Sequence, residues 1–267
     1  MLSDEDRARI VPLHGAGNFR DFGGYPAGEE MRVRRGMLFR SNRLSQLTPG
    51  DIETLEATGI ATIFDLRAER EREADPTAWQ SPHLSVHTWP PGHKRRLVDM
   101  AQEYPPDAEG ARALMTDFYA QMPRVLGHAF ADIITRIAAG AVPCVIHCSA
   151  GKDRTGVAVA LVLTALGVPR DIVLDDYAMT DRIAASEDDV ARSLFAGRDG
   201  GGRAQAAMRE RFSPEAIAVM RSARPHLIAG ALAAIDRDFE SFDAFLASIG
   251  VAPEVPQALR DRLLEPA

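Results

Sequence analysis

The stretch that decides the fold is Val145-Ile-His-Cys-Ser-Ala-Gly-Lys-Asp-Arg-Thr-Gly156. Residues 142–147 are apolar and β-branched, which predicts a buried strand. Residues 155–166 are apolar, have helical length and stop at Gly167, which predicts a helix. The polar loop between them therefore lies at a helix N-terminus.

This loop has the composition of an anion site with a nucleophile in it. Unpaired N–H groups and the helix dipole favour an anion at a helix N-terminus, and the guanidinium of Arg154 adds a fork that matches phosphate oxygens. Cys148 lies at the mouth of this site, where the same field stabilises a thiolate. A thiolate that faces a bound phosphate can attack it.

The spacing of Cys148, five residues, Arg154 and Thr155 resembles the signature loop of the cysteine-dependent tyrosine and dual-specificity phosphatases. Lys152 next to Asp153 is similar to the atypical bacterial tyrosine phosphatases that also accept phosphoinositides. Other matches to that family are Asn18-Phe-Arg-Asp-Phe-Gly-Gly-Tyr25, Phe39-Arg-Ser41 and Asp65-Leu-Arg67.

The resemblance implies a phosphomonoester hydrolase that forms a phosphocysteine on Cys148 and needs no cofactor or metal. It implies that Thr155 hydrogen-bonds the thiolate and that His147 supports the loop. The implied substrates are phosphotyrosine proteins, with phosphoserine, phosphothreonine and phosphoinositides as further possibilities. The phosphate is expected to bind to the residues of the loop itself, which are Ser149, Ala150, Gly151, Lys152, Asp153 and Arg154.

A carboxylic acid must protonate the leaving oxygen, and the candidates are Asp153 and Asp65. In better-known tyrosine phosphatases a Trp-Pro-Asp loop supplies this acid, but here Pro91 stands where that Asp would be. Asp65 ends a predicted strand over residues 60–66, at the edge of the sheet where ligands collect. We favour Asp153, because the loop carries it towards the substrate.

Three other segments have more than one interpretation. Arg20 and Asp21 either brace the signature loop or close a turn. The basic residues 93–96 form either a solvated loop or a docking surface for a polyanionic substrate, to which Lys152 would add a second cation. Residues 67–73 mix charges at helical spacing, which indicates a solvated helix face.

Strands over residues 60–66, 84–89 and 142–147 alternate with helices over 111–121 and 124–139. This predicts an α/β fold with a central, mainly parallel sheet flanked by helices, as in protein tyrosine phosphatases. After Gly167 only helices are expected. We expect one domain over residues 1–267, in which residues 182–229, with a glycine-rich break at 197–203, form either a helical cap or a mobile lid.

The net charge of −7 excludes a global basic field for nucleic acid, and no stable membrane association is expected. There is no apolar run of about 18 residues and no signal-peptide pattern, so we expect a cytoplasmic protein. Cys144 and Cys148 would be about 13 Å apart in an extended strand, too far for a disulfide, and Cys144 is expected in the core.

Two rival functions remain open from the sequence. A rhodanese-like sulfurtransferase also places a Cys loop before a helix, although the Gly151 and Arg154-Thr155 pattern speaks against it. A non-catalytic phosphate-binding module would keep the anion loop without turnover. A nucleotide P-loop does not fit, because Asp153 follows Lys152 where Ser or Thr is required.

Overall fold

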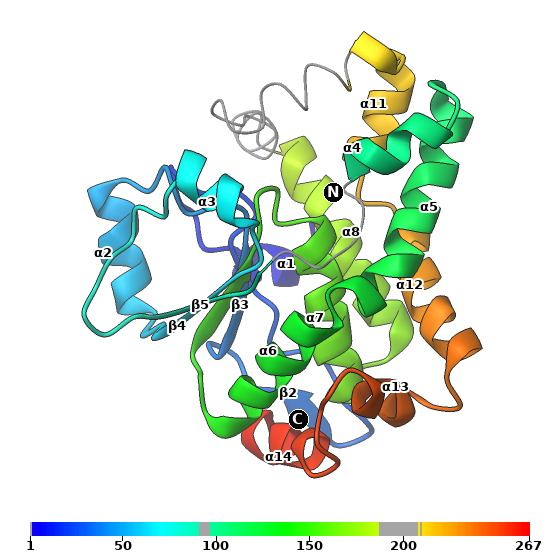
Figure 1. Ribbon diagram of the computed structural model, residues 1–267. Coiled ribbons are helices and arrows are strands. Elements are labelled where there is room, and N and C mark those ends of the chain that lie inside the picture. Colours follow the sequence, from blue (N-terminus) through cyan, green and yellow to red (C-terminus); the bar gives the residue numbers. More distant parts are fainter. Residues whose placement is uncertain (1, 91–96, 187–207, 209) are drawn as a thin grey trace.

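A computed structural model describes residues 2–90, 97–186, 208 and 210–267 (Figure 1). Its main sheet has five strands in the order β1-β3-β6-β4-β5. Strand β1 is antiparallel to β3, whereas β3, β6, β4 and β5 are parallel. The α/β class with a mainly parallel sheet is thus confirmed. The strands are β1 (Arg20–Asp21), β3 (Leu38–Ser41), β4 (Thr62–Asp65), β5 (Ser85–Thr88) and β6 (Cys144–His147).

Helices flank both faces of this sheet, with α2 on one side and α6, α7 and α8 on the other (Figure 1). Within the described ranges no helix has the length and apolar character needed to cross a bilayer. The helices are α1 (Asp4–Arg9), α2 (Pro49–Ala57), α3 (Glu69–Ala74), α4 (Leu97–Met100), α5 (Ala108–Val125), α6 (Gly127–Ala139), α7 (Asp153–Ala165), α8 (Arg170–Ser186), α11 (Pro214–Arg221), α12 (Pro225–Asp238), α13 (Phe242–Ser248) and α14 (Val255–Leu263).

The core lies on both faces of the central strand β6, because successive strand residues point to opposite sides. Val145 packs in the smaller cluster with Phe39 and with Leu55 of α2. Ile146 packs in the larger cluster, which includes Val159 of α7 and the other helices of that face. Strand β6 is therefore buried on both sides, which explains its continuous apolar sequence.

Helix α2 begins with a cap at Thr48. Thr48 accepts a hydrogen bond from the N–H of Asp51 at 3.2 Å, and the Asp51 carboxylate accepts one from the N–H of Thr48 at 2.8 Å. This is a capping box, with Pro49 in the first turn. Asp51 also accepts from the N–H groups of His14 and Gly15, so the cap anchors the N-terminal segment.

The region after Gly167 is helical as predicted, but the expectation of no further strand was wrong. Strand β7 (Leu264–Pro266) pairs antiparallel with β2 (Met31–Val33) in a separate two-stranded sheet. A three-residue strand that ends in proline is too short to show a periodic pattern. Its pairing is supported by an ion pair between Arg32 and Glu265 at 3.0 Å.

Two predicted features fall outside the described residues: the basic segment 93–96 and the glycine-rich break 197–203. Of the C-terminal helices, α11 and α12 pack on α5. Phe212 and Ala216 share a buried cluster with Ala111 and Leu114 of that helix.

Candidate active site

The signature loop connects β6 to α7, which begins at Asp153. Cys148 follows the strand directly and is buried, with 1% of its surface exposed. Gly151 has a φ of 64°, and a Cβ at this position would lie 2.4 Å from the carbonyl oxygen of Ser41. Only glycine fits there. The loop is therefore folded tightly against the end of β3, next to the N-terminus of α7.

Glu71 of α3 holds the guanidinium of Arg154 end-on. Its carboxylate oxygens lie 2.7 Å from Arg154 Nη1 and 2.9 Å from Nη2, and Nη1 also donates to the Leu66 carbonyl at 3.0 Å. Ser149 of the loop donates its hydroxyl to the same carboxylate. Burial opposes the charge of Arg154, but Glu71 and then Cys148 raise its pKa above the ordinary value. The cation beside the cysteine is thus permanent and oriented.

The expectation that residues 67–73 form only a solvated helix face was therefore wrong for Glu71. Its carboxylate is three-quarters buried and belongs to the site, whereas Glu69 and Glu73 of the same helix are exposed. Glu71 also accepts a hydrogen bond from the N–H of Ala68 at 2.8 Å, so it caps α3 while it holds Arg154.

Only one of the two carboxylate oxygens of Asp153 is hydrogen-bonded to described residues. Its Oδ1 accepts a hydrogen bond from the hydroxyl of Tyr119 at 2.7 Å and from Lys152 Nζ at 2.6 Å. The Tyr119 hydroxyl is also 2.6 Å from that of Tyr177, and burial followed by the charge of Asp153 raises the pKa of Tyr119. Across the described chain, no group hydrogen-bonds Oδ2 of Asp153, and the residue lines a cavity beside the loop.

Lys152 lies behind this carboxylate. Besides Asp153, its ammonium donates to the carbonyl oxygens of Met220 at 3.1 Å and Ser222 at 3.4 Å, at the C-terminal end of α11. Burial disfavours the charge of Lys152, but Asp153 raises its pKa above the usual range. The ammonium thus ties the loop to the C-terminal helices, an arrangement that differs from a second cation aimed at substrate phosphates.

Asp65, the other acid candidate, lies buried at the end of β4. Arg67 Nε donates to its Oδ1 at 3.0 Å and Nη2 to its Oδ2 at 2.8 Å, while His147 Nε2 is 3.7 Å from Oδ2. Burial alone would raise the pKa of Asp65, but His147 and Arg67 hold it below its usual value. The structure therefore places Asp153 at the cavity and keeps Asp65 ionised at the end of β4, in an ion pair with Arg67.

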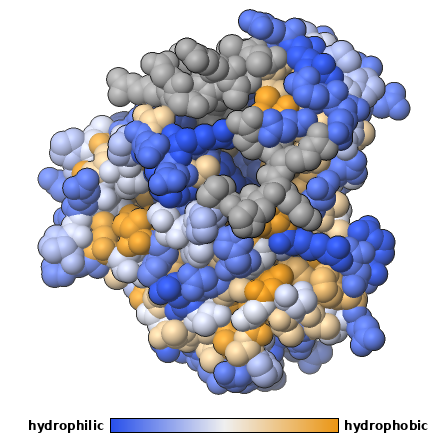
Figure 2. All heavy atoms as spheres, in the orientation of Figure 1, coloured by the Kyte–Doolittle hydropathy of each residue, from blue (hydrophilic) through white to orange (hydrophobic). Residues whose placement is uncertain are grey.

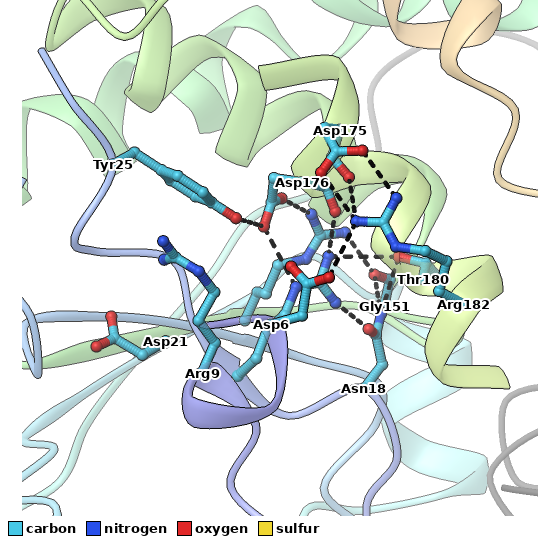
Figure 3. Close-up of polar contacts among 12 residues, drawn as sticks. Asp6, Arg9, Asn18, Asp21, Tyr25, Gly151, Asp175, Asp176, Thr180 and Arg182 are labelled. Carbon is cyan, nitrogen blue, oxygen red and sulfur yellow. Dashed lines mark hydrogen bonds and ion pairs between the residues drawn. The ribbon is translucent and has the colours of Figure 1, made fainter. Parts of the chain in front are cut away.

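A buried network around Asp176, which is labelled in Figure 3, explains the role of Arg20. Asp176 of α8 accepts a hydrogen bond from Arg20 Nε at 3.3 Å and one from Arg40 Nη1 at 2.6 Å. Arg40 Nη2 then donates to the Gly151 carbonyl at 3.0 Å, and Asn18 donates to the same oxygen at 3.2 Å. Burial disfavours a charged Asp176, but Arg20 and Arg40 lower its pKa to about 2. Arg20 thus braces the loop indirectly, because it binds Asp176, which holds the Arg40 side chain that contacts Gly151.

Asp21 has the other of the two expected roles, because it closes a turn. Its carboxylate accepts hydrogen bonds from the N–H of Gly23 at 2.7 Å and from the N–H of Gly36 at 2.9 Å.

Thr155 lies in the first turn of α7, and its buried hydroxyl has no hydrogen-bond partner in the described ranges. A thiolate acceptor would satisfy this hydroxyl.

These groups together suit phosphoryl transfer. A buried thiol lies beside an oriented guanidinium at a helix N-terminus, and a carboxylate with one unbound oxygen stands at the adjacent cavity. Cys148 can act as the nucleophile, Arg154 can stabilise the equatorial phosphate oxygens, and Asp153 can exchange a proton with the substrate.

Comparisons with known proteins agree with this chemistry. The profile described as "Tyrosine phosphatase family" matches residues 11–265. The chain is similar to the "Triple specificity protein phosphatase PtpB" of Mycobacterium tuberculosis, with 30% identity over 96% of this chain and 99% of that protein. It is also similar to a tyrosine-protein phosphatase of Nostoc commune, with 28% identity over 89% of this chain and 78% of that protein. The chain therefore belongs to the tyrosine phosphatase family.

Proposed function

We propose that the protein hydrolyses phosphotyrosine through a phosphocysteine on Cys148. The observation that carries the proposal is the meeting of Cys148, Arg154 and Asp153 at the N-terminus of α7, where Glu71 fixes the guanidinium. The resemblance of the signature loop to cysteine-dependent phosphatases supports the same conclusion.

In the first step the Cys148 thiolate attacks phosphorus, so that an S–P bond forms while the P–O bond to the leaving group breaks. Arg154 and the N–H groups of residues 149–154 bind the equatorial oxygens, where charge is stabilised. Asp153, protonated at Oδ2, gives its proton to the leaving oxygen. The products are a free alcohol or phenol, phosphocysteine and ionised Asp153.

In the second step Asp153 removes a proton from water as the water oxygen attacks phosphorus. The S–P bond breaks, inorganic phosphate leaves and the thiolate is restored, which the Thr155 hydroxyl stabilises by a hydrogen bond. Lys152 and Tyr119 keep hold of Oδ1 through both steps, so Oδ2 faces the reacting oxygen each time.

The substrate range is proposed to extend beyond phosphotyrosine to phosphoserine, phosphothreonine and soluble phosphoinositides. The name of the Mycobacterium tuberculosis relative, a triple specificity phosphatase, supports this breadth. The net charge of −7 is expected to disfavour anionic vesicles relative to short-chain, soluble lipids.

The test is phosphate release by the purified protein from a phosphotyrosine peptide and from soluble phosphoinositides. Thiocyanate formation from thiosulfate and cyanide, without phosphate release, would favour a sulfurtransferase. Tight binding of phosphopeptide without turnover would favour a non-catalytic phosphate-binding module.

The assignment of the acid is tested by comparing Asp153→Asn with Asp65→Asn on two substrates, one with a poor leaving group and one whose leaving group needs no protonation. The true acid should lose roughly 10²–10⁴-fold on the first substrate and much less on the second. Equal losses on both substrates for Asp153→Asn would show that Asp153 only shapes the loop.

A further inference from the structure

A cavity of about 310 Å³ lies beside the signature loop, between α3 and α5. Figure 2 shows that this face of the molecule is hollowed, with hydrophilic residues on the left side of the recess. One wall of the cavity is polar and includes Glu71, Asp153 and Arg154. The other walls are mainly apolar and include Trp89, Met100, Phe118, Met122, Val125 and Leu126.

The cavity lies where the leaving group of the substrate must be placed during the proposed reaction. The leaving oxygen must approach the unbound Oδ2 of Asp153 to receive a proton, while the phosphate remains on Arg154. Both residues line the cavity. The body of the leaving group is therefore directed between α3 and α5, against the apolar side chains.

The size of the cavity exceeds what one aromatic ring fills. An apolar cavity of about 150 Å³ is enough to hold benzene. A cavity of about 310 Å³ therefore has room for a ring and for an apolar extension of comparable size. It also falls at the lower end of the range of ligand pockets, about 300–1,000 Å³.

Most charges that line the cavity are already matched within the described part of the protein, whereas Arg70, an exposed lining residue, has no ion pair there. Arg154 is paired with Glu71, and Asp153 with Lys152. Arg67, which also lines the cavity, is paired with Asp65. Among the described residues, a polyhydroxylated or polyanionic leaving group would therefore find Arg70 and Gln121 as unpaired polar partners, and its hydroxyl groups would lie against the apolar walls.

We infer that this cavity is a subsite for an apolar leaving group larger than a single ring. The preferred phosphomonoesters are then esters of phenols or alcohols that carry an extended hydrocarbon body next to the phosphate. The inference rests on the proposed phosphatase function and specifies the substrate class of that site. Inositol phosphates without an apolar body are expected to be turned over less efficiently.

The test uses phenyl phosphate and its para-methyl, para-propyl and para-hexyl derivatives. Para-alkyl groups change the leaving-group basicity little, so the effect of the chain reports binding. Each methylene that enters the cavity should lower KM about fourfold until the far wall is reached, with kcat nearly constant. Inositol monophosphate serves as the polar comparison substrate.

Two variants assign the effect to this cavity. Val125→Phe should narrow the cavity and abolish the gain from the longer chains while phenyl phosphate is still hydrolysed, and Phe118→Ala should extend the gain to longer chains. Val86→Phe, at an exposed position on β5 outside the cavity, is the matched control and should behave as the wild type.

The outcomes separate this inference from the proposed function. Hydrolysis of phenyl phosphate without any chain-length dependence would overturn the subsite and leave the phosphatase assignment intact. A gain with chain length that survives in Val125→Phe would place the chain on another surface and would equally overturn it. No hydrolysis of any of these esters would contradict the proposed function itself.

Discussion

Replacing Glu71 by glutamine tests the orientation of the guanidinium at the phosphate site. The carboxylate contacts both terminal nitrogens of Arg154, at 2.7 and 2.9 Å, and no described residue accepts a hydrogen bond from Arg154 Nε. The Nε side is therefore left for phosphate oxygens. A glutamine keeps the shape of the side chain, but its NH₂ group cannot accept a hydrogen bond from the guanidinium.

The expected loss follows from the pKa of Glu71. Burial disfavours its ionised form, but Arg154 and Ser149 lower the pKa from 4.5 to about 2. A shift of this size corresponds to about 3 kcal/mol of preference for the ionised carboxylate. Screening by solvent at the quarter-exposed side chain reduces this to about 2 kcal/mol. Glu71→Gln should therefore lower the free energy of unfolding above pH 4.5 by about 2 kcal/mol, and it should lower kcat/KM because the guanidinium loses its orientation.

The assay is kcat/KM on a phosphotyrosine peptide, together with the inhibition constant of vanadate, which reports the anion site without turnover. Both should weaken. Glu73→Gln, an exposed glutamate on the same helix, is the control. Wild-type kcat/KM and vanadate inhibition in a folded Glu71→Gln protein would refute the claim that Glu71 orients Arg154.

The same pair predicts a pH dependence of stability. Because the pKa of Glu71 is lower in the folded protein than in the unfolded chain, its contribution is complete above about pH 4.5. The contribution is lost as the pH falls from 4.5 towards 2. The difference in unfolding free energy between wild type and Glu71→Gln should shrink over that range. A difference that does not change with pH would contradict the ion-pair account.

Three further substitutions test the surroundings of the loop. Asp176→Asn leaves Arg20 and Arg40 buried without a counter-charge and should lower the free energy of unfolding in urea by about 3–5 kcal/mol. This difference from the wild type should disappear as the pH falls from 3.8 to about 2. A loss below about 1 kcal/mol would contradict the claim that this ion-pair network braces the signature loop. Tyr119→Phe should lower kcat about tenfold on a poor leaving group and little on an activated one, and an equal loss on both would remove its link to Asp153. Lys152→Ala should lower phosphotyrosine and phosphoinositide turnover by the same factor, because Lys152 is bound to Asp153. A larger loss on the lipid would instead support the interpretation of Lys152 as a second cation that binds the substrate.

The central part of the fold could be predicted because its signals are local. The strand predicted over residues 142–147 is β6 (Cys144–His147), which ends directly before Cys148, and the helix begins within two residues of its predicted start. Gly151, with a φ of 64°, adopts the left-handed conformation that favours glycine. The cap at Thr48 likewise depends on residues within one helical turn.

The residues that support the loop could not be predicted, because their roles depend on contacts between distant segments. Glu69, Glu71 and Glu73 lie in one charge-alternating helix, and only the packing of α3 against the loop selects Glu71. Asp176 is one of several acidic residues on α8, and its partners come from β1 and β3. One local signal pointed to Glu71. It stands three residues after Ala68, the N-cap of α3, which is the position from which a glutamate accepts a hydrogen bond from the N-cap N–H.

The most direct test of the central claim is the detection of the covalent intermediate. Asp153→Asn should form phosphocysteine from an activated aryl phosphate, whose leaving group needs no acid, and should hydrolyse it slowly because the base is missing. Acid quench and peptide mass spectrometry should find one phosphoryl group on the peptide that contains Cys148, and none in the same protein with Cys148→Ser. Phosphate release by Cys148→Ser, or a phosphoryl group on any other residue, would contradict the mechanism.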